Sequence, residues 1–516
     1  MPRVLPLRQH RSLPGILPVL CCLASLPILA HLLVDTRVGE RKAAGRGTRG
    51  QPRDTRTLIL LDVNIRSSVR TVSENFLSIQ LDPAVVHNGW IDFLSSKRLV
   101  TLARGLAPAF LWFGGKRTDF LQFQNHRNLA KHRGELGPDY YLKNYEDDIV
   151  RSDIALDKQK GCKIAQHPDI MLELQREKAS QVQLALTKEQ FSNTYSNITI
   201  TEPNSYRTMV GRTINGSQLG KDYIQFKNLL QSVRFYTKAS LYGPNIGRPR
   251  RNTAALLDGY YIDDQTANVA DFMKTRLLDT LSDQIAKVHR VVNSHVPGKK
   301  VWLGGVGPAW AGGTTNLSDT YAAGFLWLNT LGMSAKQGID VVIRNSFFDH
   351  GYNHLVDQNF NPLPDYWLSL LYKRLVGTKV LTVQVAGLQR KPRPGRVIRD
   401  KLRIYAHCTH IRNHNYLRGS ITIYIINLHR SRKKIKLAGT LRDKTVHQYL
   451  LQPYGVQGLQ AKSVQLNGRP LLMVDDETFP ELKPRTLRAG RIVVIPPLSI
   501  GFYVVKNANA PSCKFR

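Results

Sequence analysis

Histidines and cationic side chains are the residues of this sequence whose types could support chemistry or ligand binding. His350 and His354 are four residues apart, which is the spacing of two metal ligands on one face of a helix. Gly351 lies between them, and the sequence contains no His-Glu-x-x-His arrangement. We therefore expect a structural or loop role for this pair, and we predict no metal site and no cofactor.

Arginine and lysine gather in short arrays that could bind an anionic polymer. The guanidinium fork matches the oxygen atoms of sulfate and carboxylate groups, so linear arrays suit a sulfated chain. An ordinary solvated β-turn is an equally good interpretation of 430–436, and 390–401 could be a basic loop between strands. The arrays are Lys97-Arg98, Lys116-Arg117, Arg248-Pro249-Arg250-Arg251, 390–401, and 430–436 with Arg432, Lys433 and Lys434.

The charge of the whole chain points to a polyanionic partner. The 516 residues include 73 Lys and Arg against 38 Asp and Glu, which gives a formal net charge of +35. Such a surface attracts nucleic acid or a sulfated glycan equally, so the compartment must decide between them. With 42% hydrophobic and 22% charged residues, the composition excludes a wholly disordered chain and a membrane protein with many spans.

The N-terminus predicts secretion. Three arginines precede an apolar run from Leu13 to Val34, as in a signal peptide over 1–34. A signal anchor is the alternative, but Pro14, Pro18 and Pro27 interrupt the run and favour cleavage, which leaves no stable membrane span. The expected location is the extracellular matrix or the cell surface. There a sulfated glycan, and not nucleic acid, is the expected partner.

Sequons and cysteines agree with an extracellular protein. Three sequons begin at Asn197, Asn215 and Asn316 and predict N-glycosylation. Once the two cysteines of the signal peptide are removed, Cys162, Cys408 and Cys513 remain, an odd number that implies one disulfide and one orphan. Cys408 and Cys513 lie in the same C-terminal region, so we predict that they pair.

The predicted elements that would position a site change character along the chain. Residues 35–56 are rich in Gly and Arg and predict a flexible basic N-terminus. Within 57–377, strand-like runs at 57–63, 76–81, 106–115, 300–303 and 339–348 combine with helical periodicity at 271–292, 321–332 and 364–376. Strands that alternate with helices are typical of an α/β barrel. Within 378–516, successive β runs separated by turns predict a β-sandwich, to which an N-terminal strand could add.

Several long runs resemble the heparanases, glycoside hydrolase family 79. They include FGGKRTDFLQF at 113–123, YAAGFLWLNTLGM at 321–333 and the segment FDHGYNHLVDQNFNPLPDYWLSLLYKRLVGTKVL at 348–381. RKPRPGRVIRDKLRIYAHCT at 390–409 is similar to the branch of that family that binds without cleaving. The resemblance implies a (β/α)8 barrel with a C-terminal β-sandwich, secretion, and heparan sulfate as the ligand. It also marks Arg248, Arg250 and Arg251 as a heparin-binding segment.

Two carboxyl groups only ~5 to 5.5 Å apart are needed for retaining glycoside hydrolysis. In the family the acid/base glutamate follows an asparagine and precedes a proline, and the matching residue is Glu202, with Thr201 in place of the asparagine. A carboxylate in a surface loop is an equally good interpretation of Glu202. The family's nucleophile follows a Trp-Leu-Gly strand end, where this chain has Gly305, and no Asp or Glu occurs between Asp283 and Asp319.

The resemblance also implies that segments are missing. The family carries several dozen more residues between Asn197 and Glu202, including a barrel strand and the cysteine that pairs with the equivalent of Cys162. A second segment is missing between Gly259 and Tyr260. Either skipped exons or an error in the gene model could explain these gaps, and a barrel without those strands would be incomplete.

The sequence therefore predicts a secreted pseudoenzyme that binds heparan sulfate or heparin proteoglycans. Through that shared ligand it would antagonise active heparanase indirectly. A residual endo-β-glucuronidase that uses Glu202 is the alternative from another class. A third possibility is a defective isoform that does not fold stably and is retained in the secretory pathway.

Overall fold

The structure, a computed structural model, describes the parts of the chain that carry most of the predicted elements. The chain divides into two units, Met1–Thr55 and Arg56–Arg516, and every described residue lies in the second. The predicted signal peptide and the basic segment 35–56 therefore lie outside the described residues. Those residues are 58–81, 96–113, 267–309, 313–348, 352–386 and 401–514, with a few positions between 217 and 228.

A parallel sheet of four strands joins the beginning and the end of the α/β region, in the order β4-β3-β6-β5. Its β3 and β4 are joined across α2, and its β5 and β6 across α9, as in βαβ units. Pairing of β3 with β6, through Leu77 and Val342 among others, brings the early strands next to the late ones. The bounds are β3 Leu77–Leu81, β4 Leu111–Phe113, β5 Trp302–Val306, β6 Val341–Arg344, α2 Lys97–Gly105 and α9 Ala323–Gln337.

Burial explains why these segments take their forms. Every residue of β3 and β6 is buried, as expected for parallel strands that are covered on both faces. Helix α8, Thr275–His295, buries one stripe at a spacing of three and four residues, through Leu278, Leu281, Ile285 and Val288. By contrast, α9 is buried all round from Ala323 to Ala335, so it is a central helix.

The α/β class is confirmed, whereas the closed barrel stays a prediction. A barrel places its first strand beside its last, and the contact of β3 with β6 has that form. The described residues supply four parallel strands of the eight that such a barrel requires, and they form an open sheet.

Two further sheets are formed mainly by strands that follow the last helix, α10 at Pro364–Leu375. The nine-stranded sheet has the order β14-β13-β12-β17-β10-β9-β7-β2, with β15 on β12, and the small sheet has the order β16-β11-β1-β8. The first comprises β2 Arg70–Thr71, β7 Val376–Leu381, β9 Leu402–Thr409, β10 Ile421–Asn427, β12 Val446–Tyr454, β13 Ser463–Leu466, β14 Arg469–Pro470, β15 Arg485–Leu487 and β17 Ser499–Val505; the second comprises β1 Leu58–Val63, β8 Val383–Ala386, β11 Lys433–Leu437 and β16 Val493–Ile495.

One hydrophobic cluster lies between the small sheet and the nine-stranded sheet. Ile59 and Leu61 of β1 and Ile435 of β11 meet Ile423 and Val505 in it. Along β1 buried and more exposed residues alternate, which is the pattern of a strand that covers a core with one face. The N-terminal strand therefore belongs to the C-terminal sheets, where β1 runs parallel to β11 and antiparallel to β8.

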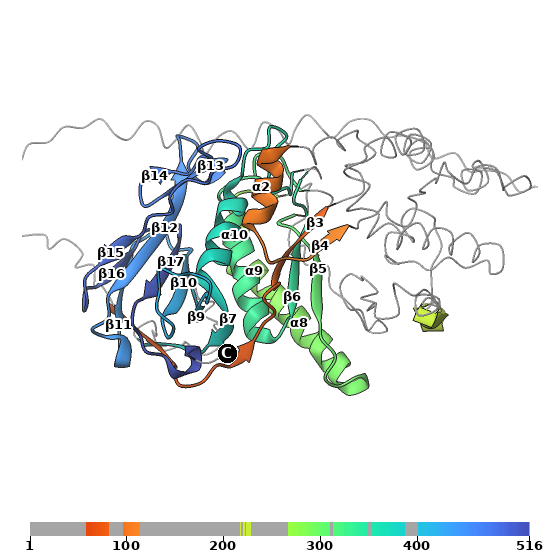
Figure 1. Ribbon diagram of the computed structural model, residues 1–516, viewed down its shortest axis with the longest axis horizontal. Coiled ribbons are helices and arrows are strands. Elements are labelled where there is room, and N and C mark those ends of the chain that lie inside the picture. Colours follow the sequence, from red (N-terminus) through yellow and green to blue (C-terminus); the bar gives the residue numbers. More distant parts are fainter. Residues whose placement is uncertain are drawn as a thin grey trace, which may run out of the picture. The chain divides into compact units, whose positions relative to one another are not determined.

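The opposite face of the nine-stranded sheet packs on α9 and α10, which lie between it and the parallel sheet (Figure 1). Tyr321 donates its hydroxyl hydrogen to the Leu451 carbonyl at 2.8 Å, and Tyr405 of β9 donates to Asn329 at 2.8 Å. After α10 the described residues carry only short 3-10 helices: η6 Gly439–Leu441, η7 Gly458–Gln460 and η8 Pro511–Cys513. No helix in the described part of the chain combines the length and apolarity of a membrane span.

Some predicted element bounds differ from the structure. The run predicted at 339–348 gives a strand only to Arg344, whose side chain turns into a buried ion pair. The apolar segment 492–505, one of the β runs predicted within 378–516, divides into β16 and β17, because Pro496 and Pro497 lie between them and Leu498 has φ 43°. Helix α2 was not predicted, although Ser96 caps it by accepting from the Leu99 amide at 3.3 Å.

Candidate functional site

The carboxyl ends of the parallel strands meet at one edge, where α/β proteins place their sites. Gly305 lies there as the second-last residue of β5, and it is buried. Its φ is +61°, in the left-handed region that glycine adopts without cost, and the register of β5 against β6 shifts between Leu303 and Val306. The end of β5 is therefore shaped around a residue without a side chain.

Arg344, the last residue of β6, contacts the ends of both β5 and β6 at this edge. Its Nη1 donates to the carbonyl of Val306 at 3.3 Å and to that of Asn345 at 2.6 Å. Its guanidinium carbon lies 5.3 Å from the centre of the Trp327 ring, close enough for a cation–π contact. The side chain is entirely buried, so its charge needs an anion inside the protein.

Asp365, in the first turn of α10, supplies that anion. Its Oδ2 lies 3.0 Å from Arg344 Nη2, and its side chain is only 4% exposed. Burial raises the pKa of Asp365 to about 6, against the opposite effect of the Arg344 charge. Ser369 donates to the Asp365 carbonyl at 2.7 Å and accepts from Trp327 Nε1 at 2.8 Å. The carboxylate is thus enclosed and serves the packing of β6, α9 and α10.

The segment that follows β6 is hydrogen-bonded to β3 and to the segment that follows β5. The Phe347 amide donates to the Gln80 carbonyl of β3 at 2.8 Å, which links the ends of two neighbouring strands. Asn353 donates from Nδ2 to the Ala309 carbonyl at 2.9 Å, and it is fully buried. These groups hold loops in place, and none is an acid that could attack an anomeric carbon.

Most of the site residues predicted from the sequence lie outside the described residues. Gly305 is described, and so are Arg432, Lys433 and Lys434, the disulfide cysteines and one sequon. Asn316 of that sequon is exposed at φ 55° in the loop before α9. Those outside are Glu202, Lys116, Arg117, Arg248, Arg250, Arg251, Asn197 and Asn215.

The basic array 430–436 is mostly a strand, so the turn interpretation is wrong for its second half. β11 begins at Lys433 and lies between β16 and β1 in the small sheet. Ile435 points into the core, whereas Lys434 and Lys436 alternate with it toward the other face. None of Arg432, Lys433 and Lys434 forms an ion pair within the described parts of the chain. Burial, together with the charges of Lys433 and Lys401, lowers the pKa of His429 to about 4.

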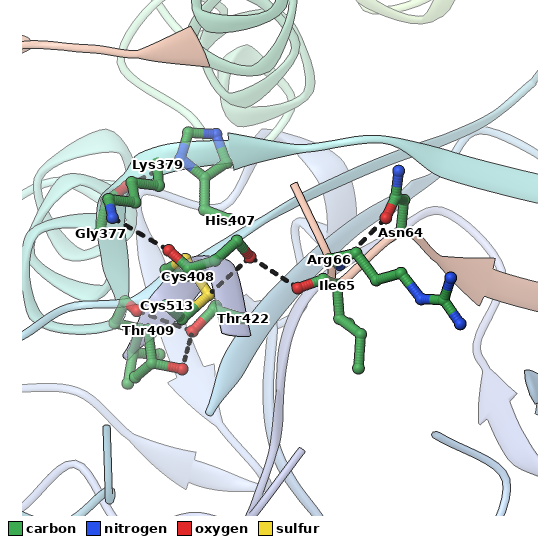
Figure 2. The surroundings of a disulfide bond; sticks show 12 residues. Asn64, Ile65, Arg66, Gly377, Lys379, His407, Cys408, Thr409, Thr422 and Cys513 are labelled. Carbon is green, nitrogen blue, oxygen red and sulfur yellow. Dashed lines mark hydrogen bonds between the residues drawn. A yellow bond between two sulfur atoms is a disulfide. The ribbon is translucent and has the colours of Figure 1, made fainter. Parts of the chain in front are cut away.

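Cys408 and Cys513 form a disulfide between β9 and η8, with 5.4 Å between their Cα atoms (Figure 2). Next to it, Ser512 donates from its amide and its hydroxyl to the Ile65 carbonyl, at 3.2 and 2.8 Å. Lys379 of β7 donates to the Ser512 carbonyl at 3.0 Å. The C-terminal segment is therefore fastened to β9, to β7 and to the chain that follows β1. The predicted orphan, Cys162, lies outside the described residues.

The buried pair of Arg344 and Asp365 was missed by sequence reasoning. The arginine within the mainly apolar run 339–348 was the available signal, because a charge that is buried there requires a buried partner. Metal chemistry finds no support in the described part of the chain, where no group of three potential ligands occurs. His354 is half-buried in a loop, and His350 lies outside the described residues.

Comparison with known proteins decides the family. The chain is 65% identical to a human protein named inactive heparanase-2, over 95% of each chain, and equally identical to its mouse counterpart. It is 35% identical to mouse heparanase, over 94% of this chain and all of the other. The chain belongs to the heparanase family. No protein-family model matches it.

Solved structures with a similar fold are glycoside hydrolases. A GH51 arabinofuranosidase from Xanthomonas axonopodis pv. citri superposes with a TM-score of 0.53, over 87% of this heparanase-family chain and 100% of that one. A 4-O-α-L-rhamnosyl-β-D-glucuronidase from Fusarium oxysporum has a TM-score of 0.52, over 86% and 100%. At 11% and 12% identity, these likenesses show the fold alone.

The alignment with human heparanase-2 also shows that this chain is shorter. It spans 565 positions, whereas 95% of the 516 residues is about 490, so about 75 positions have no counterpart here. That difference is of the size predicted for the missing family segments.

Proposed function

We propose that this chain is a secreted, catalytically inactive member of the heparanase family that binds heparan sulfate. Two observations support the inactivity: the relatives are named inactive heparanase-2, and Gly305 lies at the carboxyl ends of the parallel strands. The observation that carries it is Gly305. The resemblance to heparanases puts the nucleophile of retaining hydrolysis at this position, and here the backbone is buried and left-handed and carries no side chain.

No nearby acid replaces the missing nucleophile in the described part of this edge. Two buried carboxylates follow β5 and β6 in the chain, and each is held by a cation: Asp319 by Lys462 at 2.7 Å and Asp365 by Arg344 at 3.0 Å. A nucleophile must reach the sugar, and a side chain that is 4% exposed and paired with a cation does not. Glu202 alone could transfer a proton, but it could not form and resolve a glycosyl intermediate.

Binding is supported by charge. The chain has a formal net charge of +35, and Arg432, Lys433 and Lys434 have no carboxylate partner among the described residues. Cations without such partners remain available to sulfate and carboxylate groups of a glycan. Screening weakens such ion pairs, so retention on a heparin column should fall steeply as salt increases.

Incubation with heparan sulfate, followed by sizing of the glycan, tests the inactivity. We expect the wild-type chain and Glu202→Gln to leave the size distribution unchanged, with active heparanase as the positive control. Fragments that form with the wild type and disappear with Glu202→Gln would instead establish an endo-β-glucuronidase.

Heparin chromatography tests the binding. We expect Arg432→Glu with Lys434→Glu to elute at lower salt than Lys287→Glu with Arg290→Glu, a matched pair of charge reversals on the exposed side of α8. Elution of the wild type at low salt would contradict the proposal.

The remaining parts of the proposal concern architecture and biology. They are a family 79 type (β/α)8 barrel with a β-sandwich, secretion to the matrix or cell surface, and competition with active heparanase for heparan sulfate. Added in excess to a heparanase assay, the purified chain should slow cleavage in proportion to the glycan it occupies. No slowing at saturating chain would contradict the competition.

A further inference from the structure

A cleft of about 930 Å³ opens at the amino ends of β5 and β6, opposite the edge that holds Gly305. This volume lies within the range of pockets that enclose ligands. One wall is a polar face of α8, with Asp279, Ser282, Ala286, His289 and Asn293 at helical spacing. The other walls are the end of α9, the residues before β5 and β6, and parts of β2 and β9.

The cleft carries an excess of positive charge. Its lining contains five Lys and Arg side chains against two carboxylates, those of Asp279 and Asp340. Arg403 of β9 pairs with Asp279, and Lys300 lies 3.9 Å from Asp340. The remaining cations, Arg70, Lys299 and Lys336, have no carboxylate partner among the described residues.

Two residues that line the cleft, Arg403 and His289, have buried nitrogen atoms without partners among the described residues. The Arg403 side chain is only 14% exposed. Its Nε and Nη2 atoms are buried and have no acceptor among the described residues. Nε2 of His289 is also buried without a partner there, and the tautomer of the ring decides whether it donates or accepts. Buried polar groups are almost always hydrogen-bonded, so unmet donors call for an acceptor such as an anion or water. Burial and the Arg70 charge lower the pKa of His289, as expected where positive charges gather.

Arg70 has a structural role that accounts for only part of this arrangement. Its Nε donates to the Lys336 carbonyl at 3.2 Å at the end of α9. Its guanidinium lies over Gly338, where φ is +92° and a Cβ atom would collide with it. Helix capping therefore explains Arg70, but it gives no reason for Lys299 or for the unmet donors of Arg403.

We propose that this cleft is a second glycan site, which takes sulfate and carboxylate groups of a sulfated glycosaminoglycan segment. The choice of ligand rests on the proposed function, whereas the position of the site does not. Separate cations along one cleft suit a chain with repeated anionic groups, and planar guanidinium groups suit sulfate and carboxylate oxygens. A single inorganic anion would engage one of these cations and leave the others unused.

Calorimetric titration of the full chain with a heparin hexasaccharide tests the site. The cleft variant Lys299→Glu with Lys336→Glu reverses two exposed charges, and Lys287→Glu with Arg290→Glu makes the same change outside the cleft. We expect the cleft variant to weaken binding about 25-fold, at roughly fivefold for each exposed ion pair lost. The control should change it less than about threefold.

Each outcome decides between the two proposals. Equal weakening by both variants overturns the cleft and leaves the proposed function standing, whereas a wild type that does not bind the hexasaccharide overturns both. Inorganic sulfate and a fully desulfated hexasaccharide are the other two probes, and we expect neither to bind as tightly. If inorganic sulfate binds as well as the hexasaccharide, the cleft is a site for free anions and the glycan assignment is wrong.

Discussion

Arg344 and Asp365 form an ion pair at 3.0 Å in which the guanidinium is fully buried and the carboxylate nearly so. The pair joins the end of β6 to the start of α10, and the Arg344 guanidinium lies 5.3 Å from the centre of the Trp327 ring. Taking two charges out of water is expensive, and each one is tolerated because the other is present. At the edge where α/β proteins place their sites, this pair serves the packing and leaves neither charge exposed to solvent.

Removal of one partner should therefore be costly. We expect Asp365→Ala to lower the free energy of unfolding by about 3 to 5 kcal/mol, because it leaves the Arg344 charge buried and uncompensated. Chemical denaturation monitored by tryptophan fluorescence measures this loss. The double variant Arg344→Met with Asp365→Leu removes both charges, and we expect it to lose less than Asp365→Ala alone. An equal or larger loss would show that the hydrogen bonds from Arg344 to Val306 and Asn345 matter more than the charge.

A glutamate at the nucleophile position should fail to restore catalysis. The φ of Gly305 is +61°, where a residue with a side chain costs ~1 to 2 kcal/mol, and Gly305→Glu also buries a carboxylate. We expect this variant to be less stable than wild type and to release no reducing ends from heparan sulfate. Gly468→Ala, at φ +87° with nothing near its would-be Cβ, isolates the backbone strain. Cleavage by Gly305→Glu would show that the edge is otherwise competent.

The spacing of apolar residues along the sequence was enough to predict the three long helices of the α/β region. The apolar spacing at 271–292, 321–332 and 364–376 predicted α8, α9 and α10, and their ends differ by only a few residues. β11 was not predicted, since its lysines look solvated until β16 and β1 flank them. Whether this segment forms a strand depends on tertiary structure, because its neighbours β1 and β16 come from opposite ends of the chain.

The site was less predictable than the fold. Gly305 was found only because a resemblance marked the position, and a glycine carries no chemical signal of its own. The partnership of Arg344 with Asp365 spans 21 residues, and nothing in local periodicity brings the two together. The basic cleft likewise combines residues from Arg70 to Tyr405, so its charge excess emerges only from the packing of α8 on α9 and β9.

A buried histidine should make the protein sensitive to acid. His407 on β9 donates from Nδ1 to the Gly377 carbonyl at 2.8 Å and lies 3.2 Å from the Tyr424 hydroxyl. Burial lowers its pKa from 6.5 to about 4, so between these values the unfolded chain binds a proton that the folded chain does not. Stability from this group is complete above pH 6.5 and declines by up to about 3 kcal/mol as the pH falls to 4.

Denaturation curves collected from pH 4 to pH 7 measure this dependence. We expect His407→Gln to be less stable at pH 7 but to show a flatter pH profile, because the titrating group is gone. His414→Gln, at an exposed loop position, controls for the loss of a histidine. A slope that is unchanged by His407→Gln would assign the acid sensitivity to other groups.

The Cys408–Cys513 disulfide should contribute strongly to stability. It closes a loop with a sequence separation of 105, and in the chain-entropy view this restriction of the unfolded state is worth ~4.7 kcal/mol. We expect Cys408→Ala with Cys513→Ala to lower the midpoint of denaturation, and dithiothreitol to have the same effect on the wild type. Ser512→Ala removes the hydroxyl bond to Ile65 and leaves the sulfurs in place, so it should cost only about 1 kcal/mol. If the two perturbations were equal, the hydrogen bonds around Ser512, and not the covalent link, would be what fastens the C-terminal segment.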